Sequence, residues 1–330
     1  MLKTDIKSMN LDELTEYIKS TGQPAFRAKQ LYEWMHVKLA DSYDEMSNIP
    51  AALKQRLQNE CDMPVHELVR KQVSAEDKTA KYLFRLEDGN LMHYHHGNSV
   101  CISSQVGCRM GCRFCASTLD GLERNLRPSE MLDQIYRIQK DSGERVSNVV
   151  VMGSGEPFDN FDNFIKFEQL LTDENGLNIS ARNLTVSTCG IVPNIYRLAD
   201  MKLQLTLAIS LHAPNDERRK ALMPIANKYS IAEIMEACRY YINKTGRRVT
   251  FEYSLVKGEN DTDECAAELS ELVKGMNCHI NLIPVNPIKE RNFKQSDIDR
   301  INKFKNKLEK NRINVTIRRE MGRDIDGACG

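Results

Sequence analysis

Three cysteines near residue 110 have the spacing of ligands to an iron–sulfur cluster. Cys108, Cys112 and Cys115 form a C-x3-C-x2-C motif, and soft thiolate ligands so close in the chain favour an iron–sulfur cluster or zinc. Because zinc sites commonly pair C-x2-C units, we interpret the motif as the ligand set of a [4Fe–4S] cluster, covered by Phe114. Three protein ligands leave one iron open, and an open iron can bind a substrate.

Zinc is the alternative for the same motif, with His96 or Cys101 as a fourth ligand. The chain holds ten cysteines in 330 residues. Neither its length nor its N-terminus, which has no apolar signal segment, suits a secreted disulfide scaffold. We therefore expect metal or thiol chemistry at some of these cysteines.

Small polar residues recur where predicted strands end. Four short segments have this character: G-S-G-E-P at 153–157, S-T-C-G at 187–190, S-L-H-A-P at 210–214 and P-V-N-P at 284–287. Taken singly each is an ordinary loop, but their recurrence at successive strand ends predicts a shared cofactor site.

The elements that position these segments alternate between short apolar strands and amphipathic helices. Strands are predicted near 99–103, 148–152, 183–187, 204–210, 249–255 and 279–283, with helices such as 128–140, 231–241 and 263–274 between them. Successive βα units predict an α/β fold in which a parallel sheet curves into a partial (βα)6 barrel resembling a TIM barrel. In such folds the chemistry gathers at the carboxyl ends of the strands.

The chain is expected to divide into three parts. Residues 1–65 form a small helical domain with helices near 11–18, 26–39 and 51–61, and residues 66–97 form an extended hairpin or linker with a strand at 81–86 and a turn at 87–90. Residues 98–330 form the barrel-like core with a C-terminal catalytic tail.

Composition points to a cytoplasmic protein, because no segment approaches the roughly 18 apolar residues of a membrane helix. The 46 basic and 46 acidic residues give zero net charge, which does not exclude nucleic acid, since local basic clusters decide such binding. These clusters are solvated faces or phosphate contacts: Arg109/Arg113, Arg124/Arg127, 218–220, 244–248 and Arg318-Arg319.

The motifs together resemble those of the radical SAM superfamily. A C-x3-C-x2-C motif follows the first strand of a βα-repeat chain, and residues 153–157 resemble the superfamily's "GGEP" element. The resemblance implies a [4Fe–4S] cluster and S-adenosylmethionine (SAM) as cofactors. The residues it suggests for SAM binding are Gly155, Glu156, Ser187, Ser210, Leu211, His212 and Asn286.

Three longer segments resemble one family more closely. C-I-S-S-Q-V-G-C at 101–108, S-L-H-A at 210–213 and D-I-D-G-A-C-G at 324–330 are similar to RlmN-type methyltransferases, relatives of the Cfr resistance enzymes. The resemblance implies methylation of adenine C2 in 23S rRNA, near the peptidyl transferase centre, and in tRNA, beside the anticodon. It further implies a monomer, RNA docking by the N-terminal helices, and an electron donor such as flavodoxin or ferredoxin.

The same resemblance assigns roles to two cysteines outside the cluster motif. Cys329 would take a methyl group from one SAM and become S-methylcysteine, and a second SAM would supply a radical that activates this methyl group for attack on C2. Cys101 would then release the product by attacking the sulfur of Cys329, leaving a transient Cys101–Cys329 disulfide.

One stretch departs from the family pattern. Family members carry a proton-accepting glutamate about a dozen residues before the cysteine at position 101, in a strand that reads like V-E-S-V-L-M, and here several of these residues are missing. Glu87, or its neighbour Asp88, is the possible substitute. Two alternative functions follow: Cfr-like methylation at C8, and a catalytically impaired RNA-binding iron–sulfur protein.

Overall fold

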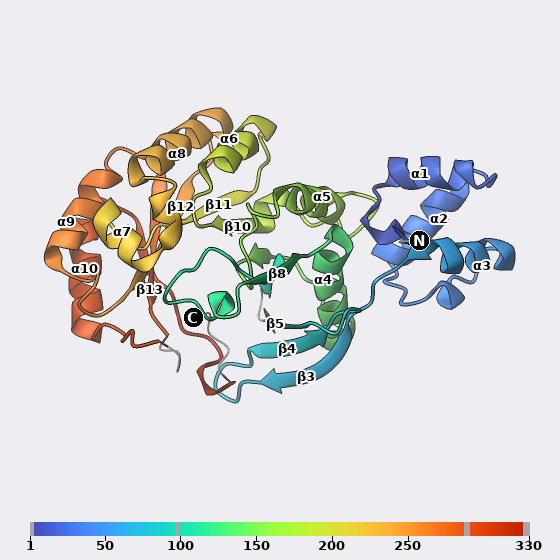
Figure 1. Ribbon diagram of the computed structural model, residues 1–330, viewed down its shortest axis with the longest axis horizontal. Coiled ribbons are helices and arrows are strands. Elements are labelled where there is room, and N and C mark those ends of the chain that lie inside the picture. The colour runs from blue at the N-terminus through green and yellow to red at the C-terminus, as the bar shows by residue number, and fades with distance from the viewer. Residues whose placement is uncertain (1–2, 97–98, 287–290, 326–330) are drawn as a thin grey trace.

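One curved sheet runs through most of the computed structural model, which describes residues 3–96, 99–286 and 291–325 (Figure 1). Seven of its strands are mutually parallel and form an open half-barrel. In spatial order they are β6 (Val100–Ile102), β9 (Val149–Val151), β10 (Leu184–Thr188), β11 (Thr206–Ser210), β12 (Val249–Leu255), β13 (Cys278–Pro284) and β14 (Val315–Ile317). The first six confirm the predicted strands, and β14 was not predicted.

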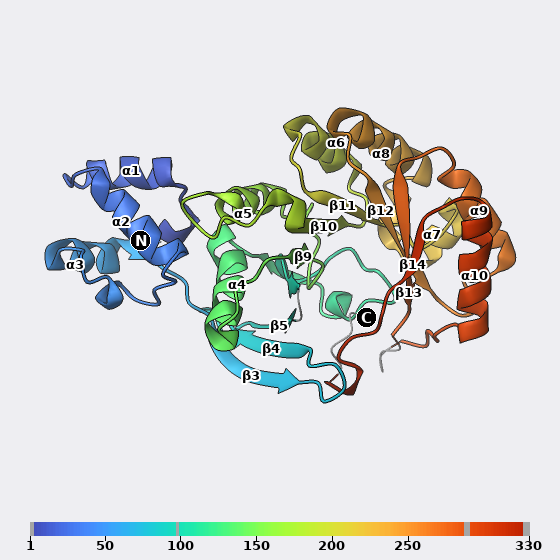
Figure 2. The ribbon, with the colours of Figure 1, turned by 180° about the vertical axis from the view of Figure 1, so that it is seen from behind.

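Helices cover the outer face of this half-barrel (Figure 2). They are α4 (Pro128–Ser142), α5 (Phe161–Thr172), α6 (Val192–Met201), α7 (Asp216–Leu222), α8 (Ile231–Thr245), α9 (Asp263–Leu272) and α10 (Ile298–Lys310). Local sequence sets their ends: α8 begins with a capping box between Ser230 and Glu233 and ends at Gly246, whose φ is 67°. The predicted alternation of strands and helices is thereby confirmed.

The predicted hairpin extends the same sheet instead of forming a separate linker. β3 (Glu67–Val73), β4 (Ala80–Arg85) and β5 (Leu91–His96) are antiparallel, and β5 pairs with β6. Ten of the described strands therefore form one sheet, with β14 at one edge and β3 at the other. The predicted strand at 81–86 and turn at 87–90 are both present.

The N-terminal helices α1 (Leu11–Ser20), α2 (Phe26–His36) and α3 (Ala51–Glu60) lie to one side of the half-barrel (Figure 1). A short parallel pair, β1 (Thr4–Asp5) and β2 (Cys61–Asp62), brings the two ends of this segment together. Between β1 and α1, Lys7 is fully buried and forms an ion pair with Asp133 of α4. None of the described helices is both long and apolar enough to cross a membrane.

Candidate active site

A small hairpin holds the loop that carries the three motif cysteines. β7 (Gln105–Gly107) pairs with β8 (Leu122–Asn125), and the backbone amide of Cys108 donates to the carbonyl of Gly121 at 2.8 Å. Gly107 has a φ of 71°, and a Cβ atom there would lie 2.0 Å from the Gly121 oxygen. Only glycine can be accommodated at position 107, where the backbone passes against Gly121 at the base of the loop.

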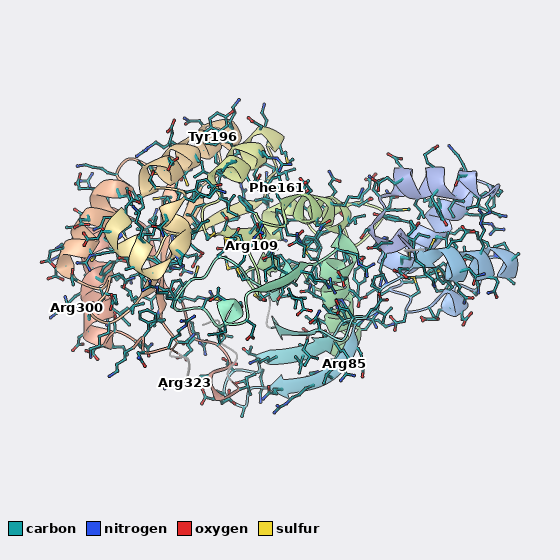
Figure 3. The ribbon with its side chains drawn as sticks, viewed as in Figure 1. Arg85, Arg109, Phe161, Tyr196, Arg300 and Arg323 are labelled. Atoms are coloured by element: carbon teal, nitrogen blue, oxygen red, sulfur yellow. The ribbon has the colours of Figure 1, made fainter. Side chains whose placement is uncertain are left out.

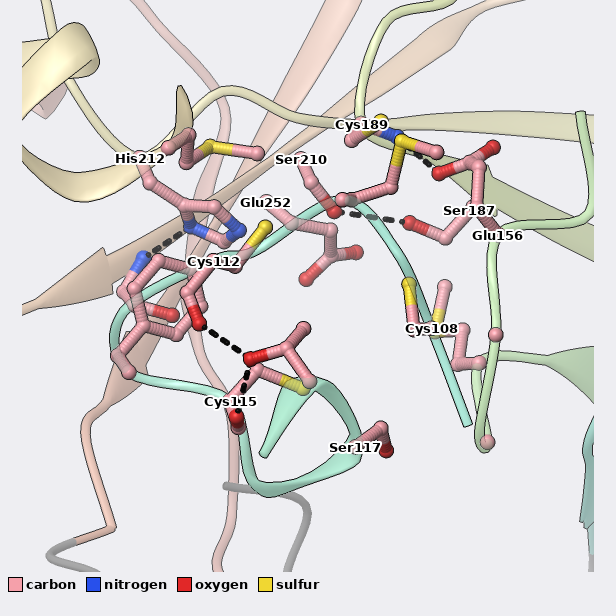
Figure 4. A pocket seen from close by; sticks show the side chains of 18 of the residues that line it. Cys108, Cys112, Cys115, Ser117, Glu156, Ser187, Cys189, Ser210, His212 and Glu252 are labelled. Carbon is pink, nitrogen blue, oxygen red and sulfur yellow. Dashed lines mark hydrogen bonds between the residues drawn. The ribbon is translucent and has the colours of Figure 1, made fainter. Parts of the chain in front are cut away.

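The loop places its thiols at an open cavity on the inner side of the half-barrel (Figure 4). Cys108, Cys112 and Cys115 all line this cavity, which has about 880 Å³ of empty space, part of it open to solvent. The hydroxyl of Thr118 donates to the carbonyls of Cys112 and Cys115 at 3.0 and 2.9 Å. This hydroxyl braces the turn between two of the three thiols.

The surroundings of the thiols fit an iron–sulfur cluster. Burial raises the pKa of the Cys108 thiol to about 12 and raises that of Cys112, so a cationic centre is needed to keep them as thiolate ligands. Their apolar neighbours include Met110, Phe114 and Met223, a shell that limits water access. No three described His, Cys, Asp or Glu side chains converge as around a single ion, but each ligand of a cubane binds a different iron.

Glu156 follows β9 and ties two strand ends together. Its carboxylate accepts hydrogen bonds from the backbone amides of Cys189 at 2.7 Å and Phe158 at 3.0 Å, and burial raises its pKa. Both carboxylate oxygens therefore accept hydrogen bonds from the protein backbone, and the side chain also lines the cavity. Gly155, with a φ of 102°, passes so close to Gln105 that a Cβ would lie 2.5 Å from that side chain.

The next strand ends bring polar side chains to the inner face. Ser187 of β10 and Ser210 of β11 lie with their hydroxyl oxygens 3.2 Å apart (Figure 4). The strand register places Ser210 beside Glu252 of β12, whose carboxylate accepts a hydrogen bond from the side-chain amide of Asn281 at 2.9 Å. Ser187, Ser210 and Glu252 all line the cavity.

His212 lines the cavity in a defined tautomer. Its φ is 56°, and its Nδ1 accepts a hydrogen bond from the Ser254 amide at 2.9 Å, which leaves Nε2 as the donor. Burial, with the nearby Arg219 cation, lowers its pKa to about 3. The ring of Phe114 packs edge-on against the imidazole with centroids 4.8 Å apart. A neutral N–H donor therefore faces the site.

Arg219 lies behind the site, fully buried. Its guanidinium donates to the carbonyls of Cys189 at 2.5 Å, Leu211 at 3.2 Å and Ser210 at 3.3 Å. The predicted basic cluster at 218–220 is therefore only partly a surface feature. Other expected basic clusters are neutralised locally, with Arg109 paired to Asp159 and Arg124 to Glu130.

Four predicted site residues do not line the cavity. Leu211 is buried in the main hydrophobic core, Asn286 lies beyond β13 without reaching the cavity lining, and exposed Glu87 pairs with Arg127 at 3.3 Å. Cys101 is buried on β6. Cys329 lies outside the described residues, and the described cysteines form no disulfide with one another.

The strand register nevertheless puts Cys101 on the inner face of the sheet. Cys101 pairs with Val150, which pairs with Thr185, and aligned residues of neighbouring strands point to the same face. Ser187 lies two residues beyond Thr185 and shares that face. Cys101 thus faces the same side of the sheet as a residue that lines the cavity.

Sequence reasoning did not single out Glu252 and Ser254, which lie on β12 and line the cavity. Two further lining residues, Cys189 in the 187–190 segment and Arg318 in a basic cluster, were named from the sequence, but neither was given an individual role in cofactor binding. The available signal was Glu252, the one charged residue in the strand V-T-F-E-Y-S-L. A charged residue in such a parallel strand faces either a partner or a site.

Comparison with known proteins agrees with this geometry. The Radical SAM superfamily model matches residues 102–269, and the model of the ribosomal RNA large subunit methyltransferase N-terminal domain matches residues 4–63. A crystal structure of a radical SAM methyltransferase from Sphaerobacter thermophilus superposes with a TM-score of 0.95 at 41% identity, covering 99% of this chain and 98% of that one.

Curated relatives extend the match along the whole chain. A "Probable dual-specificity RNA methyltransferase RlmN" from Lachnospira eligens is 72% identical over 332 residues, which cover 99% of this chain and 95% of that protein. The protein of the same name from Lachnoclostridium phytofermentans is 61% identical, with 99% and 94% coverage. The chain therefore belongs to the RlmN family of radical SAM RNA methyltransferases, whose cofactors are a [4Fe–4S] cluster and SAM.

Proposed function

We propose that this chain methylates C2 of adenine in 23S rRNA and in tRNA, through an S-methylcysteine on Cys329 and with two SAM molecules per turnover. One observation carries the proposal: the three motif thiols and the polar strand-end residues line a single cavity. The names of the relatives support RNA as substrate, since they are called dual-specificity RNA methyltransferases.

In this proposal Cys108, Cys112 and Cys115 hold the cluster, and the strand-end residues hold SAM. When bound, the cluster supplies an electron for reductive cleavage of SAM. Nε2–H of His212 and the hydroxyls of Ser187 and Ser210 then offer hydrogen bonds to polar groups of the cofactor. The hydrogen bonds that Glu156 accepts from the backbone and those that Arg219 donates to carbonyls keep these strand ends in place.

The two remaining cysteines carry the methyl group and release the product. The Cys329 thiolate displaces S-adenosylhomocysteine from the methyl carbon of the first SAM. The radical derived from the second SAM would remove a hydrogen atom from the S-methyl group, and the resulting carbon radical would add to C2. Loss of one electron, which would return to the cluster, and of the C2 proton to a base would leave a methylene bridge between the Cys329 sulfur and C2. The Cys101 thiolate would then attack that sulfur, breaking its bond to the methylene carbon, which takes up a proton to become the methyl group. The methylated adenine leaves, and an external reductant, such as a thiol, reduces the Cys101–Cys329 disulfide. The inner-face position of Cys101 supports this role.

Glu87, the expected substitute for the family's proton acceptor, does not line the cavity. Glu87 is exposed and paired with Arg127, which supports the second candidate function, an RNA-binding iron–sulfur protein with impaired turnover. Among the described residues, Glu156 and Glu252 are the carboxylates that line the cavity, and both hold hydrogen bonds within the protein.

RNA docking is assigned to the N-terminal part. We propose that residues 1–65 form the docking domain, residues 66–97 join it to the core, and residues 98–330 form the catalytic core and tail. The family match over 4–63 supports the first assignment. Because the target base must leave its stack to reach a recessed site, docking must hold the RNA by shape and phosphate contacts. The enzyme would act on these RNAs in the cytoplasm.

The test uses the full chain, reconstituted anaerobically and incubated with SAM, a reductant and 23S rRNA fragments or tRNA. Mass spectrometry of digested RNA should find 2-methyladenosine, and 8-methyladenosine would favour Cfr-like chemistry instead. Cys108→Ala should abolish iron binding and SAM cleavage; normal iron content in this variant would refute the ligand assignment. Cys101→Ala should accumulate an RNase-sensitive protein–RNA adduct, whereas Cys238→Ala, which removes a buried thiol from α8, should not.

A further inference from the structure

The C-terminal tail leaves one edge of the sheet and reaches the other. After β14, Arg318 donates its backbone amide to Leu282 at 2.8 Å, and its side chain lines the cavity. Residues 322–325 then contact the turn between β3 and β4, at the opposite edge. Both ribbon views show the red tail beside the tip of this hairpin (Figures 1 and 2). The tail therefore spans the open side of the half-barrel.

Two reciprocal hydrogen bonds join the tail to that turn. Oδ2 of Asp77, in the turn, accepts from the Gly322 amide of the tail at 2.9 Å. Oδ2 of Asp324, in the tail, accepts from the Ala75 amide of the turn at 2.9 Å. Each segment thus supplies one carboxylate and one amide to the other. Hydrogen bonds to an ionised acceptor are stronger than those between neutral groups.

Hydrogen bonds within the turn between β3 and β4 fix its conformation. The Ser74 hydroxyl accepts from the amides of Glu76 and Asp77 at 3.1 and 3.2 Å. The other carboxylate oxygen of Asp77 accepts from the Thr79 amide at 2.9 Å. Because these bonds fix the Asp77 carboxylate within its own turn, its Oδ2 is oriented before the tail arrives.

The tail is equally adapted. Gly322 is buried, with a φ of 63°, so glycine allows the bend that presents its amide to Asp77. Its carbonyl accepts from the Ile325 amide at 3.2 Å, which forms the short turn that carries Asp324. Arg323, labelled in Figure 3, lies on this turn. The lowered pKa values of Asp77 and Asp324, caused chiefly by hydrogen bonds from Gly322 and Ser74 respectively, are consistent with ionised acceptors.

We propose that Asp77 and Asp324 are positioning residues that latch the tail onto the β3–β4 turn and thereby keep Cys329 within reach of the cavity. The latch itself follows from the two contacts, whereas its purpose rests on the role given to Cys329 above. Cys329 follows the latched residues closely in the chain, so loosening the latch would release the segment that carries it.

Hydrogen–deuterium exchange of the full-length, cluster-loaded protein tests the latch without any reaction. Asp77→Ala removes the acceptor of the Gly322 amide but leaves Asp324 to bind Ala75. If the two contacts open together, the amides of Gly322 and Ala75 should both exchange roughly three- to tenfold faster in this variant. Asp324→Ala, which removes the acceptor of the Ala75 amide, should likewise accelerate exchange at both amides. Glu76→Ala is the matched control, because it removes a carboxylate from the same turn that accepts no hydrogen bond from the described part of the tail, up to residue 325. Wild-type exchange at Ala75 in Asp77→Ala would overturn the latch.

Methylation of Cys329 then tests the purpose. With SAM as the probe, mass spectrometry of the C-terminal peptide should show slower methyl uptake in Asp77→Ala and Asp324→Ala, while Glu76→Ala matches the wild type and all variants keep normal iron content. Asp77→Asn, which keeps an acceptor oxygen, should lie between. Wild-type methylation despite a loosened tail would overturn the positioning role. No methylation in the wild type would instead refute the proposed function, and the exchange result would still decide the latch.

Discussion

The Lys7 ammonium lies 2.9 Å from Oδ1 of Asp133, and both side chains are fully buried. This ion pair joins the segment before α1 to helix α4 of the half-barrel. Lys7 also donates to the Pro64 carbonyl at 2.7 Å, and Asp133 also accepts from the His66 amide at 2.6 Å. One carboxylate therefore fixes both ends of the N-terminal helical segment against the core.

Lys7→Met should destabilise the protein strongly, because it leaves a buried carboxylate without its ammonium partner. Breaking one side of such a pair typically costs about 3–5 kcal/mol, and urea denaturation would measure the loss. Lys19→Met is the control, since Lys19 pairs with Glu16 on the surface, where side-chain exposures are 52% and 75% and such pairs contribute about 0–1 kcal/mol. Equal effects of the two substitutions would contradict the assignment.

Gly107→Ala should abolish cluster binding, because the new Cβ would collide with the Gly121 carbonyl at 2.0 Å. Gly246→Ala is the matched control: its φ of 67° is similar, but a Cβ there meets nothing within 4 Å. The control should lose about 1–2 kcal/mol of stability from backbone strain and keep its iron. Iron and sulfide analysis of the Gly107→Ala and Gly246→Ala proteins would distinguish these outcomes. A Gly107→Ala protein with a full complement of iron and sulfide would show that the loop can close differently.

Glu168 of α5 should make stability fall as pH rises. It is 4% exposed, and burial raises its pKa from 4.5 to about 7. The folded state therefore holds the proton more tightly than the unfolded state. The stability that this tighter proton binding contributes is complete below the pKa of Glu168 in the unfolded state, and it is lost as pH rises through the pKa in the folded state. Between pH 5 and pH 8 the loss amounts to about 2–3 kcal/mol.

Glu168→Gln should remove this dependence and be more stable than the wild type at pH 8 but little different at pH 5. Denaturant titrations at both pH values would measure it, with Glu144→Gln as an exposed control. Parallel pH profiles for the wild type and Glu168→Gln would show that the carboxyl ionises normally in the fold.

The chain should methylate Cys329 and cleave SAM, yet release methylated RNA slowly. The reason is local, since Glu87 is held by Arg127 outside the cavity, and a positioned base contributes about 10²- to 10⁴-fold. Inserting a family-like strand segment with one glutamate between Asn90 and Leu91 should restore turnover, while the same insertion with glutamine should not. Efficient 2-methyladenosine formation by the chain as it stands would mean that another group already serves as base.

The barrel strands could be predicted because buried parallel strands are short apolar runs set between amphipathic helices. Strand β14 could not, because Val315–Ile317 lies mostly exposed at the edge of the sheet, so it lacks the apolar run that marks the equally short buried strands β6 and β9, and arginines follow it. The attachment of the hairpin to the barrel was missed for a similar reason. Among the described residues, β5 and β6 share two residue pairs, His95 with Cys101 and His96 with Val100, and no local pattern specifies so short a contact.

The candidate site was predictable where residue type and spacing determine it, as for the cysteine motif and for the strand-end residues His212, Ser187 and Ser210. It was not predictable where function depends on burial. Arg219 is part of a basic run in the sequence but is fully buried behind the site. Glu252 is marked in the sequence only as the charged residue of a predicted strand, and its place beside Ser210 is known only from the strand register.

The contact between Asp77 and the tail also limits how far the chain end can travel. From Asp324 to Cys329 an extended chain of about five residues reaches at most about 17 Å, whereas from the end of β14 about twelve residues would reach about 40 Å. The volume open to the Cys329 thiol scales with the cube of that reach. For a target within the shorter reach, tethering raises the effective concentration of the thiol by about tenfold, with no added contact to cofactor or RNA.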